Sequence, residues 1–459
     1  MSEIVWAVLF ISISTTAAWF FYTRVVWPVF FTPLSKVPHA HPSVGISSFW
    51  INRIRSTGYA NETIHRIHEK YGPVVRLGPN EISINCVDEG VKKVYGSGFE
   101  KSNWYRKFDY FGKSTLMHSP NLHQNVIEVM LQRVTPILAE AANTESPLNV
   151  FDLYRASTLD FVSAFLFGPE SGTNSLENRQ ERANIFRMYA DESKAPIWRH
   201  PLLGFIAPSM NNSMDPGLFH LCMRMCESAK ARLLSHIDSG SKGLVFHQLQ
   251  EAGLNPIEMA SELVDHFTAG HQTSSATLTF LSYQLSACPD VQEKLREEMR
   301  SILPMPMRTG DPSMASYLKS LDALPLLDAV VMETLRLYPP IAGPQPRITP
   351  NRPMPLGPFT LPPRTEISAQ AFSLHRNPDV FPDPLHWVPE RWLEKNRNDM
   401  RRWFWAFGSG GRMCIGSNFA MILYTQFRTV LVENEKPSPR DGYRGGPKRE
   451  VLDLQFSCL

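Results

Sequence analysis

The chain opens with an apolar run, from Ile4 to Thr23, that carries no formal charge. Twenty helical residues rise about 30 Å, which matches the hydrocarbon core of a bilayer. A cleaved signal peptide would place basic residues before a shorter apolar stretch, whereas Ser2 and Glu3 stand here. The pattern therefore predicts a transmembrane anchor at residues 1–24. Because Arg24 and Lys36 follow the run and no basic residue precedes it, we expect the body to be cytosolic.

Prolines recur at short intervals after the anchor, at Pro28, Pro33, Pro38 and Pro42. Proline interrupts helices, so we expect no continuous helix here and predict a stiff, proline-rich connector at residues 25–42. Residues 43–459 show no internal repeat and no second linker. They are predicted to form one domain.

Helical periodicity dominates from about Leu122 to Leu337. The clearest helix begins after Asn255, which has the side chain of an N-cap, with Pro256 at the first helical position and Glu258 placed to complete a capping box. Nothing breaks this pattern before Pro289. Two other helices are expected at Asn61–Tyr71 and Leu324–Tyr338. Short strand-like runs are expected at Val74–Leu77, Glu81–Asn85, Gln345–Thr349, Pro358–Leu361, Thr365–Ser368 and Val451–Phe456.

These elements predict a mainly α fold, a single large helical domain with small β-sheets preceded by one transmembrane helix. The 459 residues carry 46 basic and 44 acidic side chains, and this balance excludes a bulk nucleic-acid binder. Six cysteines without a CxxC pair indicate neither a disulfide framework nor a zinc site.

The stretch Phe-Gly-Ser-Gly-Gly-Arg-Met-Cys-Ile-Gly, from Phe407 to Gly416, carries the clearest chemistry. Its glycines allow the backbone to press against a flat surface, and a helical pattern follows Cys414. Cys414 at a helix start would be favoured as a thiolate, the form that binds metal. A dinucleotide-binding loop would need glycine at Met413, so that reading fails. A glycine-rich turn with an ordinary buried cysteine remains the alternative when the stretch is taken alone.

Three further motifs accompany the cysteine: Glu333-Thr-Leu-Arg336, Pro389-Glu-Arg-Trp392, and Ala269-Gly-His-Gln-Thr273 in the longest helix. In this order and at these separations, the four elements closely resemble the cytochrome P450 family. The resemblance extends from about residue 33 onward. The runs Pro33–Pro38, Tyr71–Glu81 and Phe99–Lys101 further resemble membrane-bound fungal members that act in secondary metabolism.

On the proximal side, the resemblance implies haem b with Cys414 as the thiolate ligand of the iron. Phe407 would shield the sulfur. Arg412 would pair with a haem propionate, and Arg347 is a second candidate for that role. His123 matches a histidine that the family usually follows with basic residues, one of which binds a propionate. Here Gln-Asn-Val-Ile-Glu follows His123, and roughly a dozen residues are missing relative to the family pattern.

On the distal side, Ala269 and Gly270 look like the small residues that open an oxygen groove, and Thr273 like the hydroxyl that helps deliver protons. The residue before this threonine is commonly acidic in the family, whereas this chain has Gln272, which cannot release a proton at neutral pH. We expect His271 to pack away from the iron. Glu333, Arg336 and Arg391 match the family's structural triad, a buried ion-pair network with a folding role.

The resemblance thus predicts a monooxygenase that inserts one oxygen atom from O₂ into a small lipophilic substrate. No flavin- or nicotinamide-binding stretch is apparent, so the electrons are expected from NADPH–cytochrome P450 reductase in the same endoplasmic reticulum membrane. Its other partners would be O₂ and membrane lipid, with no nucleic acid. Two alternatives stay open: a haem-thiolate rearrangement or peroxide-using enzyme, which Gln272 favours, and a non-catalytic relative with impaired haem binding, which the short segment after His123 favours.

Overall fold

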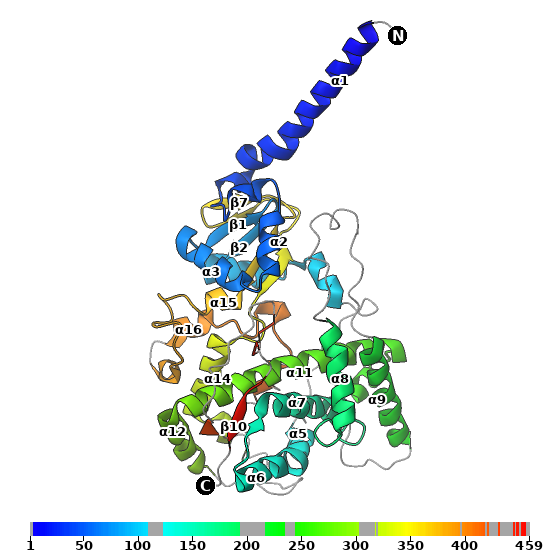
Figure 1. The fold of residues 1–459 in the computed structure, drawn as a ribbon, viewed down its shortest axis with the longest axis vertical. Helices are drawn as coiled ribbons and strands as arrows, with labels where there is room; N and C mark the ends of the chain where they lie inside the picture. The colour runs from blue at the N-terminus through cyan, green and yellow to red at the C-terminus, as the bar shows by residue number, and fades with distance from the viewer. Residues whose placement is uncertain are drawn as a thin grey trace.

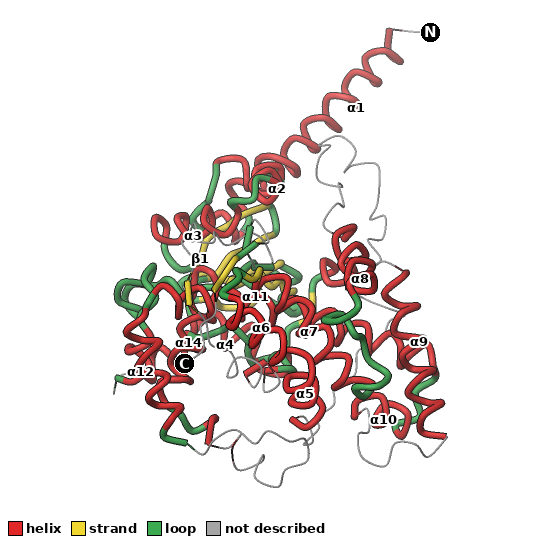
Figure 2. Tube along the Cα trace, turned by 60° about the horizontal axis from the view of Figure 1, so that its bottom comes forward, coloured by secondary structure: helices red, strands yellow, loops and turns green. Residues whose placement is uncertain are grey.

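The computed structural model describes residues 3–108, 123–192, 216–234, 244–302, 317, 320–394, 397–417, 420–421, 430–431, 444–445, 447–448 and 451–455. The fold is mainly helical with small sheets, as predicted. A long amino-terminal helix projects from the body in both views (Figures 1 and 2).

The projecting helix begins as α1, Glu3–Phe21, and continues as a π-helical segment, η1, from Tyr22 to Phe31. The helix continues through Pro28 and ends at Phe31, so residues 25–42 begin in a helix but do not form one continuous helix. Proline clashes with the carbonyl four residues earlier in an α-helix, and the wider π turn relieves that contact. Within this helix, the segment Trp6–Phe31 is long and apolar enough to cross a membrane, and no part of it is buried.

The end of the projecting helix is attached to the body by Arg76. This fully buried side chain donates from Nη1 to the Pro28 carbonyl at 3.0 Å, from Nε to Gly78 O at 3.1 Å and from Nη2 to Pro79 O at 2.7 Å. Gly45 packs against the same turn, where a Cβ would lie 3.1 Å from a methyl group of Val29. The helix end therefore contacts the first strand of the body through buried polar bonds.

The largest apolar core of the body lies mainly between α5, α7, α9, α11 and α14, whereas α2, α3 and α4 pack in smaller separate clusters. Their bounds are α2 Phe49–Ser56, α3 Ala60–Tyr71, α4 Lys92–Gly96, α5 His123–Val129, α6 Thr135–Thr144, α7 Val150–Phe167, α8 Arg179–Glu192, α9 Pro216–Leu234, α10 Leu244–Glu251, α11 Pro256–Ala287, α12 Pro289–Arg300, α14 Pro325–Leu337, α15 Ala371–Leu374 and α16 Arg397–Trp403. Short 3₁₀ and π segments are η2 Pro33–Lys36, η3 Pro42–Gly45, η4 Val87–Val91, η5 Asn103–Phe108, η6 Met130–Val134, η8 Pro389–Leu393 and η9 Gly410–Arg412.

Helix α11 crosses the body and contacts α7, α9 and α14 (Figure 1). Its start matches the sequence prediction: the Asn255 side chain accepts from the Ile257 and Glu258 N–H groups, and Glu258 accepts from the Asn255 N–H. The 32 residues of α11 end at Ala287, before Pro289. Most of α11 is buried, but Ala269 is exposed and Gly270, Gln272 and Thr273 are half-buried.

Three small sheets complete the body. The largest has the order β1-β2-β8-β5-β3, with β1 Val74–Gly78, β2 Glu81–Ile84, β3 Glu100–Lys101, β5 Pro344–Ile348 and β8 Glu366–Gln370. The strands predicted at Val74–Leu77 and Glu81–Asn85 are confirmed as β1 and β2, which pair antiparallel, and β8 pairs with β2 in parallel, with Ile82 opposite Ile367. The other sheets comprise β4 Leu148–Asn149, β10 Asp453–Gln455 and β9 Val430–Leu431, and the pair β6 Met354–Leu356 and β7 Phe359–Leu361.

Candidate active site

The cysteine loop, Phe407–Gly416, is a tight turn closed by backbone hydrogen bonds. The Cys414 N–H donates to the Phe407 carbonyl at 2.8 Å, and the Met413 N–H donates to Gly410 O at 3.1 Å. Gly408 and Gly410 take φ values of +70° and +67°, which side chains other than glycine rarely adopt. The Ala420 N–H donates to Gly416 O at 2.8 Å, an α-helical bond, so Cys414 stands just ahead of a helical turn.

Gly410 brings this loop against α4. A Cβ at residue 410 would collide with the Tyr95 carbonyl oxygen and would lie 2.9 Å from the Gly96 Cα. The second glycine, Gly411, has open space where its Cβ would be. The loop can take this position only because residue 410 has no side chain. A side chain at residue 411 would enter open space.

Cys414 is exposed, and its thiol accepts from the Gly416 N–H. Although this side chain has exposed surface, the atoms packed around the sulfur partly desolvate it and raise the pKa of the thiol above its ordinary value, while the Gly416 N–H lowers it. The amide acts in the direction that the helix-start argument predicts, but desolvation outweighs it, so the net shift is opposite to the predicted one. A bound metal ion would itself deprotonate such a thiol.

The donor set at Cys414 fits a metal that brings its own additional ligands. Within the ranges that the structure describes, no group of three His, Cys, Asp or Glu side chains could hold a bare metal ion. Haem supplies four nitrogen ligands and takes one axial ligand from the protein. An exposed single cysteine in a close-packed loop meets that requirement.

Aromatic side chains support the loop from the core side. The Phe407 ring is half-buried, and its centroid lies 6.4 Å from that of Phe404. Phe404 in turn stacks on His375, with centroids 5.4 Å apart and rings 7° from parallel. The role of Phe407 in shielding the sulfur stays a prediction.

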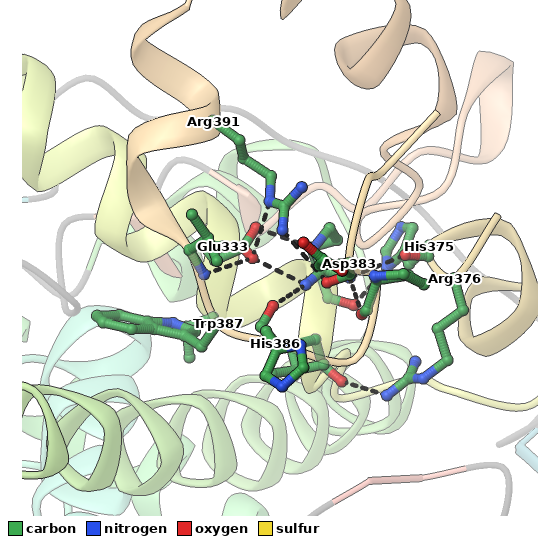
Figure 3. A network of polar contacts seen from close by, with 12 residues as sticks. Glu333, His375, Arg376, Asp383, His386, Trp387 and Arg391 are labelled. Carbon is green, nitrogen blue, oxygen red and sulfur yellow. Dashed lines mark hydrogen bonds and ion pairs between the residues drawn. The ribbon is translucent and has the colours of Figure 1, made fainter. Parts of the chain in front are cut away.

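Glu333, Arg336 and Arg391 come together in one buried ion-pair network (Figure 3). Arg336 reaches Glu333 through two nitrogens, and Arg391 Nε reaches the same carboxylate at 3.1 Å. The Trp392 indole and the Val388 N–H also donate to Glu333, at 2.9 Å each. The carboxylate is therefore saturated with donors, as a buried charge requires.

The arginines of this network also hold the chain between β8 and α16. Arg336 Nη1 donates to the carbonyls of His375 and Pro384, and Arg336 Nη2 donates to that of His386. Arg391 Nη1 donates to Pro382 O at 2.6 Å. Because Arg391 comes from η8 and Arg336 from α14, the network fixes this irregular segment against a core helix.

On α11, the open face carries Ala269 and Thr273, one helical turn apart. Thr273 Oγ1 donates to the Ala269 carbonyl at 2.8 Å. The structure places Gly270 differently from these two, since a Cβ there would lie 2.9 Å from Val162 Cγ2 in α7. Gly270 thus allows α7 and α11 to approach closely, and its predicted part in an oxygen groove stays a prediction.

Gln272 contacts a residue that sequence reasoning missed. Its Oε1 accepts a hydrogen bond from Arg444 Nη1, which comes from the carboxyl-terminal part of the chain. The Gly445 N–H donates to Pro340 O at 2.7 Å, and a Cβ at 445 would lie 2.7 Å from Pro339 O. The segment that carries Arg444 is therefore pressed against the end of α14, and no motif around Arg444 signals this contact.

His271 packs into the core, as expected. Its Nδ1 lies 3.1 Å from Thr158 Oγ1, and its ring meets those of Phe186 and Tyr189. Burial, with the nearby Arg155 and Arg444 guanidiniums, holds the pKa of this imidazole well below its usual value. His271 is therefore neutral and directed toward α7 and α8.

Arg347 presents an unusual buried guanidinium. Its Nη1 donates to Tyr105 Oη at 2.8 Å and to Pro346 O at 2.9 Å, and its charge lies over the Tyr95 and Tyr105 rings. Among the described residues, its Nε has no hydrogen-bond partner. A buried donor without an acceptor is costly, and an anionic group such as a propionate would satisfy it. The side chains of the other predicted haem contacts, Arg412 and His123, lie outside the described residues.

The comparisons with known proteins agree with this site. A family model described as Cytochrome P450 matches residues 114–440, and the chain belongs to the cytochrome P450 family. The chain is similar to Cytochrome P450 monooxygenase ankB of Aspergillus thermomutatus, with 25% identity over 459 aligned residues that cover 91% of this chain and 86% of the relative. It is also similar to Cytochrome P450 monooxygenase orf2 of Aspergillus niger, with 27% identity and coverage of 94% and 91%.

Family membership makes the chain a cytochrome P450 monooxygenase, an enzyme class that uses haem, O₂, an organic substrate and a redox partner. The site residues described above fit a haem: Cys414 offers one axial sulfur, and Arg347 offers a buried cation with a spare donor.

Proposed function

We propose that this protein is a membrane-anchored haem b monooxygenase that inserts one oxygen atom from O₂ into a small lipophilic substrate in fungal secondary metabolism. Electrons come from NADPH through cytochrome P450 reductase. The observation that carries the proposal is the exposed Cys414 thiol at the end of a loop whose backbone is closed by its own hydrogen bonds. The similarity to fungal monooxygenases supports the same conclusion.

Haem bound through a thiolate supplies oxygen activation, because the sulfur pushes electron density toward the iron and favours O–O cleavage. The protein's own residues hold and orient this group. Cys414 provides the sulfur, the Gly416 N–H tempers its charge, and Arg347 pairs with a propionate.

Thr273 and Gln272 define the side of the site where protons are needed. The Thr273 hydroxyl, which rests on Ala269 O, can accept a hydrogen bond from water and donate one in turn. Gln272 is held by Arg444 and orients water without releasing a proton. Proton delivery in this protein therefore runs through Thr273 and solvent water.

We infer a location at the endoplasmic reticulum membrane, with the body in the cytosol. The apolar segment Trp6–Phe31 supports a membrane location. Arg24, near the carboxyl end of this segment, and Lys36, beyond it, support a cytosolic body. A lipophilic substrate that partitions into the bilayer would reach an enzyme held at the same surface.

The test is the visible spectrum of the reduced, CO-bound full-length protein. A thiolate-ligated haem gives a Soret band far to the red of an imidazole-ligated one, and Cys414→Ser is expected to abolish that band. A protein that carries no haem, or a Cys414→Ser spectrum equal to the wild type, would contradict the proposal. The first of these outcomes would favour the non-catalytic relative.

A second candidate is an enzyme that uses peroxide or rearranges its substrate without a reductase. Gln272 favours it, because no acidic side chain stands beside Thr273 to supply protons for oxygen cleavage. Product formation with NADPH, reductase and O₂ supports the monooxygenase. Product formation with hydrogen peroxide alone, and none with NADPH and reductase, supports the second candidate.

A further inference from the structure

His375 follows α15 and is completely buried, with hydrogen bonds at both ring nitrogens. Nδ1 lies 3.0 Å from the Arg336 carbonyl oxygen, and Nε2 lies 2.7 Å from the Trp405 backbone nitrogen. A carbonyl only accepts and a backbone N–H only donates, so Nδ1 must carry the proton and Nε2 must accept. The contacts therefore select one neutral tautomer of this imidazole.

This imidazole connects two parts of the site through its hydrogen bonds. On one side, Arg336 of the ion-pair network donates from Nη1 to the His375 carbonyl at 3.0 Å, so the two residues bond twice. On the other side, Trp405 precedes the cysteine loop, and its indole N–H donates to Ser409 Oγ within that loop at 3.0 Å. The stack of His375 on Phe404 adds an apolar contact along the same route.

Replacing His375 would leave the Trp405 N–H without its hydrogen-bond acceptor. Trp405 is 3% exposed, so water cannot replace the imidazole as acceptor without entering the core. Leaving a buried N–H without an acceptor is costly, and the local backbone can lower that cost only by moving. Movement at Trp405 is transmitted to Ser409 and to the turn that presents Cys414.

The charged groups around His375 keep it neutral. Burial lowers the pKa of this imidazole to about 3, and the Arg336 and Arg376 guanidiniums act in the same direction. Glu333 is the nearest carboxylate in the network, and both of its oxygens are bound by Arg336. The Nε2 lone pair is thus available to Trp405 at neutral pH.

We propose that His375 is a positioning residue that couples the buried Glu333–Arg336–Arg391 network to the cysteine loop through Trp405, and so holds the Cys414 sulfur in place as an axial ligand. This inference rests on the proposed haem-thiolate function. It assigns to His375 an effect on the fraction of haem that is bound through the Cys414 thiolate. This effect is separate from any effect of His375 on the stability of the fold.

The experiment compares variants of the full-length holoprotein by their reduced, CO-bound spectra. His375→Gln places an amide oxygen near the position of Nε2 and retains an acceptor for Trp405. His375→Asn reaches only the Nδ1 position, and His375→Phe retains the stack on Phe404 with neither polar bond. We expect the ratio of the red-shifted Soret band to the imidazole-like band to fall at least about tenfold in the Asn and Phe variants, the cost of one stranded donor. The Gln variant should retain most of it.

His68 provides a matched control. It is also buried and bonded at both nitrogens, to Gly72 O at 2.9 Å and Ser83 Oγ at 2.8 Å, but it joins α3 to β2 instead of the cysteine loop. His68→Phe should lower the unfolding temperature as His375→Phe does, yet leave the ratio of Soret bands unchanged.

The inference fails if His68→Phe and His375→Phe lower the band ratio equally, or if the Asn and Gln variants at 375 have the same ratio. Because the Asn and Gln variants differ by one methylene, their comparison holds even where the Phe variant does not fold. A wild-type protein without a red-shifted band would overturn the proposed function itself, and this inference with it.

Discussion

Both carboxylate oxygens of Glu333 accept hydrogen bonds from Arg336, one from Nε and one from Nη2, each at 2.8 Å. Neither side chain has any exposed surface. A buried ion pair of this kind is a weak source of net stability, but removing one partner strands the other charge away from water. The geometry therefore predicts a severe effect from single substitutions and a mild one from exchanges that retain the charge.

Glu333→Gln is expected to lower the free energy of unfolding by about 3–5 kcal/mol, because Arg336 and Arg391 lose their shared counter-charge. Guanidinium unfolding of the detergent-solubilised chain, followed by tryptophan fluorescence, measures the change. The control is Arg364→Gln, which breaks an ion pair with Glu100 whose two side chains are 53% and 63% exposed. That change should cost less than about 1 kcal/mol, and equal losses at the two sites would contradict the predicted role of burial.

Gly410→Ala is expected to lower haem retention sharply. The added Cβ would meet the Tyr95 carbonyl, and φ of +67° is unfavourable for alanine, so the loop must shift away from α4. We expect about 1–3 kcal/mol from the backbone conformation alone. Gly411→Ala, where the new methyl group enters open space, is the matched control. The ratio of haem absorbance to protein absorbance after gel filtration should fall only for the first variant.

The contact between Gln272 and Arg444 can be measured by a double-mutant cycle. Gln272→Ala, Arg444→Met and the double variant should give a coupling energy of about 1–2 kcal/mol in thermal or guanidinium unfolding, since a half-buried hydrogen bond with one charged partner is lost in each. Additive effects would show that the contact contributes nothing. Gln272→Glu should stabilise the protein only while Arg444 is present, because the gain comes from a charge-assisted bond.

Buried neutral histidines predict a loss of stability in mild acid. Burial lowers the pKa of His68 to about 4 and that of His375 to about 3. Below pH 6.5 the unfolded chain binds protons on both residues and the folded chain does not, so the free energy of unfolding falls as pH falls through this window. Between pH 6.5 and pH 5 the two residues together account for about 3 kcal/mol.

Unfolding curves at pH 7, 6 and 5 measure this dependence. His68→Gln and His375→Gln should each flatten it, whereas His220→Gln, at an exposed position of α9, should leave it unchanged. A pH dependence as steep in both core variants as in the wild type would assign the acid sensitivity to other groups, among them the buried His271.

Local signals in the sequence were sufficient for the long elements. The capping box at Asn255 and the proline at 289 define both ends of α11, because side chains within one turn of each end determine where the helix stops. The two-residue strands β3 and β4 were missed, since each exists only through its pairing with a strand more than 200 residues away.

The residues of the candidate site likewise divide into those that a local motif reveals and those that only tertiary packing brings together. The cysteine loop and the ion-pair residues carry short motifs that can be read along the chain. Arg444 and His375 carry no local pattern, and their partners, Gln272 and Trp405, are set by how the carboxyl-terminal segment and the loop before the cysteine pack. Pro28 is the opposite case. A proline normally predicts a break in a helix, but the wider turn of η1 accommodates this one.

The bond from Arg76 to the Pro28 carbonyl has a mechanical consequence for the proposed membrane anchor. A helix that joined the body through a slack tether would let the catalytic portion tumble above the lipid. Here the last turn is clamped to the first strand, so any tilt that the helix adopts to match bilayer thickness rotates the whole body with it. Lipid composition would then set the angle between the body and the plane of the membrane.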